Sequence, residues 1–241
     1  VLFMRALCLV TEAFGGKGGI AQYNIDLLVS LCNYSRFTEI VAITRLSQGP
    51  ISALPANLTY VTPGPSKIQF IKAALGLIKS HMGSELIVCG HINLLPIAYV
   101  LSFFTRAPLV LLIYGIDVWQ KHESRMVNLL LSHVTAFISI SEITLEKFFD
   151  WSKLSSHKAH VLHNAIDLTK YRPGPKSLQL LERYKLTDKT VLMTAGRISA
   201  DERSKGFDEV VDVLPAILRE NSNVVYLICL LYTSPSPRDR G

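Results

Sequence analysis

Short runs of apolar residues alternate with amphipathic stretches along most of the chain. Each apolar run is continuous, as in a strand that is buried on both faces of a sheet. Between these runs, apolar residues recur at helical spacing, for example at Ile25, Leu28, Val29 and Cys32. Strands that alternate with helices in this way predict an α/β protein built on parallel sheets.

The same pattern gives the order of the expected elements. Ser141 precedes one of the helices, and its side-chain oxygen can accept a free backbone N–H there, so we expect it to cap that helix. The expected strands are 5–10, 39–44, 58–61, 85–89, 109–113, 135–140, 159–162, 190–195 and 224–228. The expected helices are 20–32, 68–81, 94–104, 123–132, 142–150, 178–184 and 207–219.

A polar stretch around Pro173, Gly174 and Pro175 separates two α/β segments, and such composition is typical of a crossing between domains. We expect an N-terminal Rossmann-like domain at 1–163, a crossing at 164–188 and the start of a second, incomplete domain at 189–228. Residues 229–241 carry prolines that exclude a helix or a central strand. We expect this segment to be a non-native tail, and a genuine disordered C-terminus is the alternative.

Composition narrows the class of protein. Hydrophobic residues make up 49% of the chain, which excludes a disordered protein. The net charge is +6, but the basic residues are scattered, whereas a nucleic-acid binder gathers them in blocks. The distribution favours small anionic substrates or weak attraction to an anionic membrane face. The 4 cysteines form no C-x-x-C motif, so we expect small buried core residues in a reducing compartment.

The apolar runs of the sequence predict neither a secretory signal nor a membrane-spanning helix. The apolar run near the N-terminus is too short for a signal sequence, and it continues into polar residues. The longest apolar stretch, 94–114, is interrupted by polar residues and a proline, so each part is too short to cross a bilayer. We expect a cytoplasmic protein, with peripheral association with the inner membrane face left open.

A glycine-rich loop stands between the first strand and the first helix: Gly15, Gly16, Gly18 and Gly19. Free backbone N–H groups at a glycine-rich helix start bind phosphate without side chains. Gly16, Gly18 and Ala21 also match G-x-G-x-x-A, the dinucleotide fingerprint. However, four residues separate the strand from the first glycine, and the second strand ends without an acidic residue for a ribose. A flexible turn without a ligand is the alternative.

A second strand–loop–helix carries two cations, Arg197 just after the strand and Lys205 just before the helix. Open α/β sheets bind ligands at this edge. Arg197 can pair with two phosphate oxygens, and Lys205 adds a point charge beside a helix N-terminus. The pattern therefore indicates an anion site, with an ordinary solvated loop as the alternative.

Three segments in this order resemble the retaining glycosyltransferases of family 4. They are the glycine loop at 15–19, then Asn164-Ala165-Ile166-Asp167 with Tyr171-Arg172-Pro173, then Gly196-Arg197 with Lys205-Gly206-Phe207. The family pattern reads roughly N-G-V-D-x-x-x-F-x-P, then G-R, then K-G. The resemblance implies the GT-B architecture, with two Rossmann-like domains, and covers roughly residues 5–228.

The resemblance also implies an activity. A hexosyl group would move from a UDP- or GDP-sugar to a glycan or lipid-linked acceptor, with retention of configuration. Arg197 and Lys205 would neutralise the departing diphosphate without a metal or other cofactor, and Gly15, Gly16, Gly18 and Gly19 would bring backbone donors to the phosphate or the acceptor. Family members carry an E-x7-E segment further on. None follows Ile228, so we expect no turnover from this chain.

Residues at other strand ends are candidates for the acceptor side: Tyr114, Asp117, Ser139 and Asn164, with His91 as a low-ranked catalytic candidate. Many family members have His-Gly-x-Glu where this chain has Tyr114-Gly115-Ile116-Asp117, and a tyrosine cannot carry a proton as histidine does near neutral pH. A structural role for His91 stays open. Two rival functions are an NAD(P)-binding oxidoreductase and a non-catalytic binding fragment.

Overall fold

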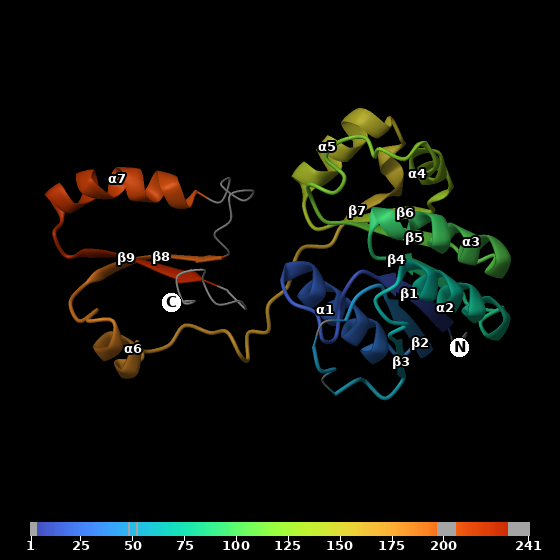
Figure 1. Cartoon of the computed structure of the whole chain (residues 1–241), viewed down its shortest axis with the longest axis horizontal. Helices are drawn as coiled ribbons and strands as arrows, with labels where there is room; N and C mark the ends of the chain where they lie inside the picture. The colour runs from blue at the N-terminus through green and yellow to red at the C-terminus, as the bar shows by residue number, and fades with distance from the viewer. Residues whose placement is uncertain (1–3, 48, 52, 197–205, 231–241) are drawn as a thin grey trace. The chain divides into compact units, whose positions relative to one another are not determined.

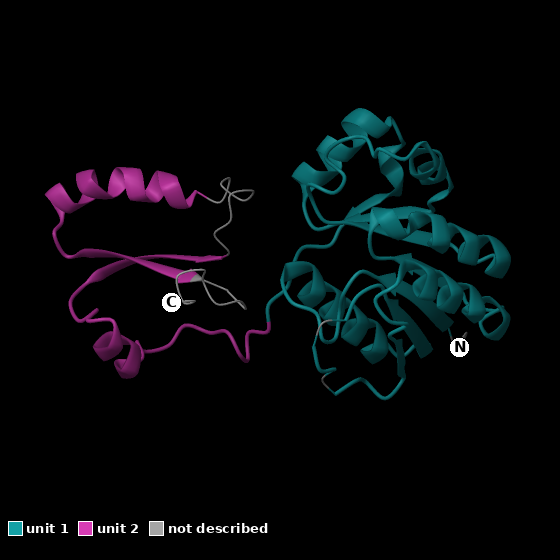
Figure 2. Ribbon diagram, viewed as in Figure 1, with its two compact units in different colours: residues 1–166 teal, residues 167–241 magenta. Residues whose placement is uncertain are grey.

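The chain divides into two compact units, residues 1–166 and 167–241 (Figure 2). The computed structural model describes residues 4–47, 49–51, 53–196 and 206–230. In the first unit, seven parallel strands form one sheet in the order β3-β2-β1-β4-β5-β6-β7 (Figure 1). Their bounds are β1 Met4–Val10, β2 Phe37–Thr44, β3 Leu58–Val61, β4 Leu86–Cys89, β5 Leu109–Ile113, β6 Ala136–Ser139 and β7 Ala159–Val161.

Helices cover both faces of this sheet. Residues that alternate along β1 point to opposite faces, so Leu7 and Leu9 pack with one core and Cys8 with the other. The core that contains Leu7 holds residues of four helices, and the core that contains Cys8 includes Leu28 of a fifth. The first four are α2 Lys67–Ser80, α3 Leu95–Thr105, α4 Arg125–Leu130 and α5 Glu142–Ser152; the fifth is α1 Gly19–Asn33.

Local sequence explains where several helices begin. Ser66 and Gln69 form a reciprocal capping box at the start of α2. Ser141 accepts the backbone N–H of Thr144 at 3.3 Å, which confirms the expected cap of α5. Short 3-10 turns, η1 Ile92–Leu94, η2 Leu131–His133 and η3 Ser156–Lys158, lie beside α3, α4 and β7.

The described part of the second unit is smaller. Strands β8 Thr190–Gly196 and β9 Val224–Leu230 pair in parallel, with α6 Leu178–Arg183 before them and α7 Phe207–Glu220 between them. Gly206 precedes α7 with φ +75°, a left-handed conformation that glycine adopts without strain. Pro215 stands inside α7, which stays helical through it.

The strand–helix order follows the sequence pattern, and β3 and β5 match their expected bounds to the residue. Three expectations need correction. The helix expected at 123–132 is only Arg125–Leu130 and then tightens into η2. Strand β9 continues to Leu230, beyond the expected end at Ile228. Cys229 is exposed rather than buried, because it lies on the two-stranded sheet, which buries less than the seven-stranded one.

No helix among the described residues is long and apolar enough to span a bilayer.

The core beside α5 provides a test of the fold. Phe148 is fully buried and its ring lies 5.1 Å from that of Phe137 and 5.3 Å from that of Trp151. We expect Phe148→Ala to lower the free energy of unfolding by about 3–5 kcal/mol, because it leaves a cavity among aromatic rings. Urea unfolding followed by tryptophan fluorescence measures this, since Trp119 and Trp151 both lie in the first unit.

The matched control is Ile143→Ala on the same helix, where the side chain is 60% exposed. It should change the stability by less than about 0.5 kcal/mol. Equal effects of the two substitutions would contradict the described packing of α5.

Candidate functional site

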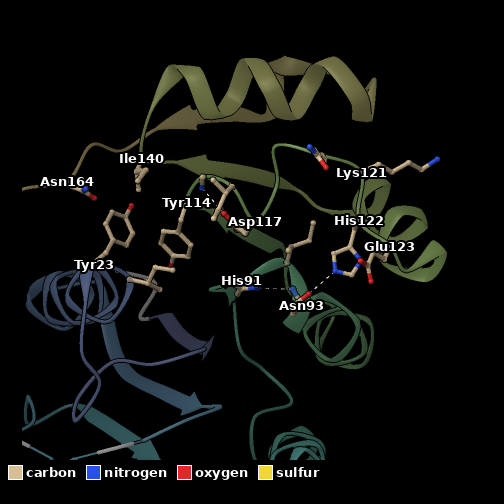
Figure 3. A pocket seen from close by; sticks show the side chains of 16 residues that line it. Tyr23, His91, Asn93, Tyr114, Asp117, Lys121, His122, Glu123, Ile140 and Asn164 are labelled. Atoms are coloured by element: carbon tan, nitrogen blue, oxygen red, sulfur yellow. Dashed lines mark hydrogen bonds between the residues drawn. The ribbon is translucent and has the colours of Figure 1, made fainter. Parts of the chain in front are cut away.

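A cavity of about 950 Å³ opens at the carboxyl edge of the seven-stranded sheet (Figure 3). All strands of this sheet are parallel, so the segments that follow them meet at one edge, which is where open α/β sheets bind ligands. Residues that follow β1, β4, β5, β6 and β7 supply the wall. They are Gly19, Ile20, Tyr23, His91, Ile92, Asn93, Tyr114, Gly115, Ile116, Asp117, Gln120, Lys121, His122, Glu123, Ile140 and Asn164.

The fold brings five of the candidates from the sequence to this cavity and leaves others away from it. Gly19, His91, Tyr114, Asp117 and Asn164 line it. The residues that do not line it are Gly15, Gly16, Gly18 and Ser139. Arg197 and Lys205 lie outside the described residues.

Asp117 lines the cavity, and its two carboxylate oxygens have different surroundings. Its Oδ1 accepts the backbone N–H of Gly115 at 2.7 Å. Its Oδ2 is buried and has no hydrogen-bond partner among the described residues. A buried carboxylate oxygen without a partner is costly, so a turn of the side chain that brings Oδ2 to a donating ligand hydroxyl or amine gains a strong hydrogen bond.

Asn93 connects two histidines at the cavity (Figure 3). Its backbone N–H donates to Nδ1 of His91 at 3.1 Å, and its Oδ1 lies 2.8 Å from Nε2 of His122. The Nδ1 of His122 accepts the backbone N–H of Ser124 at 3.0 Å. Because both Nδ1 atoms accept, this network assigns the ring proton of each neutral histidine to Nε2.

His91 is therefore a hydrogen-bond donor at the cavity rather than a base. Burial lowers its pKa below the ordinary value, and His122 lowers it further, while Asp117 opposes both. The imidazole is neutral at pH 7, and its Nε2–H has no hydrogen-bond partner among the described residues. The cavity thus offers a hydrogen-bond donor from His91, which a sugar hydroxyl oxygen can accept.

The hydroxyl of Tyr114 makes its hydrogen bond within the protein. The hydroxyl donates to Oδ1 of Asn24 at 2.7 Å, and the Asn24 amide donates in turn to the carbonyl of Glu12 at 2.8 Å. Asn24 is fully buried on α1, and burial raises the pKa of Tyr114 above its ordinary value. The residue therefore ties α1 to the end of β5, and its ring forms part of the cavity wall.

The glycine loop has two distinct parts. Gly15 has φ +82°, and a Cβ on Gly16 would lie 2.8 Å from Cβ of Glu12, so this half needs glycine for its own packing. Gly18 has φ +96° and precedes α1 without a side-chain cap. No atom lies within 4 Å of a Cβ built on Gly18 or Gly19. The start of α1 is thus open beside the cavity, with the first backbone N–H groups of the helix directed outward.

Two further candidates have different surroundings. Ser139 is fully buried, and its hydroxyl donates to the carbonyl of Ser141 at 2.8 Å and accepts the Ser141 N–H at 3.2 Å. It therefore shapes the turn before α5. Asn164 is exposed and borders both this cavity and a second one of about 330 Å³ beside α1.

Two residues of α5 hold the loop that follows β5, which forms part of the cavity wall. The indole N–H of Trp151 donates to the carbonyl of Val118 at 2.7 Å, next to Asp117. The ammonium of Lys147 lies 3.5 Å from the ring centroid of Trp119, within the range of a cation–π contact. These contacts and the Asn93–His122 bond hold the loop in place.

Sequence reasoning missed Asn24, Asn93 and His122. The only sequence signal for His122 was weak: it lies in a run of polar residues, 120–123, just before an expected helix. Among the described residues, no group of three or more His, Cys, Asp or Glu side chains is arranged to hold a metal ion.

Comparison with known proteins gives fold likeness without close sequence relatives. No protein-family model matches the sequence, and no curated protein does. The structure of HepE from Anabaena, in complex with UDP and glucose, aligns with a TM-score of 0.62 at 17% identity and covers 95% of this chain. WaaG, a glycosyltransferase involved in lipopolysaccharide biosynthesis, aligns with a TM-score of 0.57 at 12% identity over 93% of the chain.

A protein from Listeria monocytogenes, provisionally assigned as a UDP-N-acetylglucosamine 2-epimerase, aligns with a TM-score of 0.56 at 12% identity over 100% of the chain. The chain spans 62% of the length of HepE, 63% of WaaG and 65% of the Listeria protein. Likeness at this identity is a likeness of fold. The chain therefore has the expected α/β fold of the GT-B type, with the seven-stranded unit as a Rossmann-like half.

Proposed function

We propose that the chain is part of a glycosyltransferase, which moves a hexosyl group from a UDP- or GDP-sugar to a glycan or lipid-linked acceptor with retention of configuration. The observation that carries the proposal is the cavity at the carboxyl edge, with His91 and Asp117 in its wall. The fold likeness to HepE, whose structure holds UDP and glucose, supports a nucleotide-sugar donor.

In the transfer, the bond between the sugar carbon and the diphosphate oxygen breaks, and an acceptor hydroxyl oxygen bonds to that carbon. The acceptor hydroxyl gives its proton to the leaving diphosphate, on whose oxygen negative charge develops as the bond breaks. In this proposal the Asp117 side chain turns so that its buried Oδ2 accepts a hydrogen bond from an acceptor hydroxyl, and Nε2–H of His91 donates one. These residues orient the acceptor.

In this proposal, other groups neutralise the negative charge on the diphosphate. Arg197 and Lys205 stand in the sequence between β8 and α7 and supply two positive charges, so no metal is required. The open start of α1 at Gly18 and Gly19 adds backbone N–H donors for an anion or a sugar oxygen.

Nucleotide selectivity separates this proposal from an oxidoreductase. We expect heat of binding in isothermal titration with UDP or GDP and none with NADPH, since four residues separate the end of β1 at Val10 from Gly15, whereas the first glycine of a dinucleotide fingerprint follows its strand directly. Binding of NADPH together with no response to UDP or GDP would overturn the proposal. Incubation with UDP-N-acetylglucosamine, analysed for the epimerised sugar, tests the activity suggested by the Listeria protein.

Asp117 can be tested with glucose as the probe. In the presence of saturating UDP, we expect Asp117→Asn to weaken glucose binding by about 10–100-fold, because a hydrogen bond to a charged group contributes about 1.5–3 kcal/mol. Saturation-transfer NMR measures the affinity. Asp150→Asn, an exposed aspartate on α5, is the control and should bind like the parent protein. Unchanged binding by Asp117→Asn would remove this residue from the site.

Tyr114→Phe separates a structural hydroxyl from a sugar contact. The substitution leaves the buried Asn24 oxygen without its donor, so stability should fall by about 1–3 kcal/mol. Glucose affinity should stay within about twofold, because the hydroxyl is already used inside the protein. Urea unfolding and the NMR assay measure both. Tyr34→Phe, 50% exposed at the end of α1, is the control. A loss of affinity at unchanged stability would contradict this role.

A further inference from the structure

Helices α2 and α3 expose large apolar side chains. Phe103 is 66% exposed, Phe104 52%, Ile68 64% and Leu75 39%. Contiguous exposed apolar patches are uncommon on soluble proteins and mark sites of interaction. We refer to the exposed side chains of these helices as the α2–α3 surface: Ile68, Ile71, Lys72, Leu75, Lys79, Phe103, Phe104 and Arg106.

The two helices that carry this surface are neighbours. On α2, Ile68, Ile71 and Leu75 recur at helical spacing, on the side away from the buried Phe70 and Ala74. The two helices pack against each other on the same face of the sheet. Figure 1 shows them side by side.

Aromatic rings extend the surface along α3. The ring centroids of Phe103 and Phe104 lie 5.5 Å apart, and that of Tyr99 lies 6.3 Å from Phe103 and 5.0 Å from His133. The two phenylalanines stand at the end of α3, next to Arg106. Aromatic rings beside basic residues are typical of contact with the interface of a bilayer.

The charge of the surface has one sign. The segments that form α2 and α3 contain Lys67, Lys72 and Lys79, with Arg106 just after α3, and neither helix contains Asp or Glu. All four cations are exposed. In a symmetric contact between two copies the same cations would face one another, which opposes self-association. An anionic partner is the complement.

We propose that the α2–α3 surface binds an anionic phospholipid bilayer. The phenylalanine rings enter the boundary between headgroups and acyl chains, and the lysines pair with lipid phosphates. The proposed attachment is peripheral, because it is made by exposed side chains of two surface helices. It does not depend on the proposed catalysis.

The two phenylalanines lie away from the cavity. Helix α3 begins after His91, at the carboxyl edge, and ends before β5 begins, at the opposite edge. Phe103 and Phe104 therefore contact the bilayer at the end of the unit away from the cavity.

Vesicle co-sedimentation of the 241-residue chain tests the proposal. We expect binding to phosphatidylglycerol-containing vesicles and little binding to pure phosphatidylcholine vesicles. The double variant Phe103→Ala, Phe104→Ala should lower the partition coefficient about 100-fold, since burial of each ring contributes about tenfold. Lys72→Gln and Lys79→Gln should each lower it about fivefold at low salt. Tyr171→Ala removes a 68% exposed aromatic of the second unit and should bind like the parent chain.

Three outcomes would overturn the proposal. They are equal binding to both vesicle types, no loss of binding in the phenylalanine double variant, or light scattering that shows a dimer for the parent chain and a monomer for the double variant. The last outcome would show that a second copy occupies the surface. Because the side chains changed are exposed, unfolding followed by tryptophan fluorescence should be the same for all variants, which separates lost binding from lost folding.

Discussion

The parallel direction of all seven strands is the constraint on which the rest of the first unit depends. It requires a crossover after every strand, and the crossovers supply the helices that bury both faces. It also brings the carboxyl ends of the strands to a single edge, so that residues far apart in sequence, such as Gly19, His91, Asp117 and Asn164, border one cavity. Because the strands themselves are apolar, the polar side chains that can bind a ligand lie at that edge.

A few buried hydrogen bonds then fix the polar groups there. The Tyr114–Asn24 bond ties α1 to the end of β5. Trp151 fastens the following loop at Val118, and Asn93 holds two histidine rings in defined tautomers. A carboxylate held by such a frame loses little conformational freedom when a ligand binds, which is how a site gains affinity from preorganisation.

The two proposals use different parts of the same unit. Sugar transfer needs the cavity at the carboxyl edge, where burial gives an unpartnered oxygen and a neutral imidazole. Lipid binding needs the outward side of α2, where lysines alternate with exposed apolar side chains, and the exposed phenylalanines at the end of α3.

The sequence by itself determined the α/β class, the order of the elements and the strand ends at which Tyr114 and Asp117 stand, because periodicity and local caps depend on neighbouring residues. It also pointed to His91. Only the tertiary structure decided what these residues do. The Tyr114 hydroxyl bonds Asn24, which is 90 residues away in the chain, and His122 reaches Asn93 across 29. Such partners meet through packing of the whole sheet, and no local pattern encodes which side chain will lie opposite.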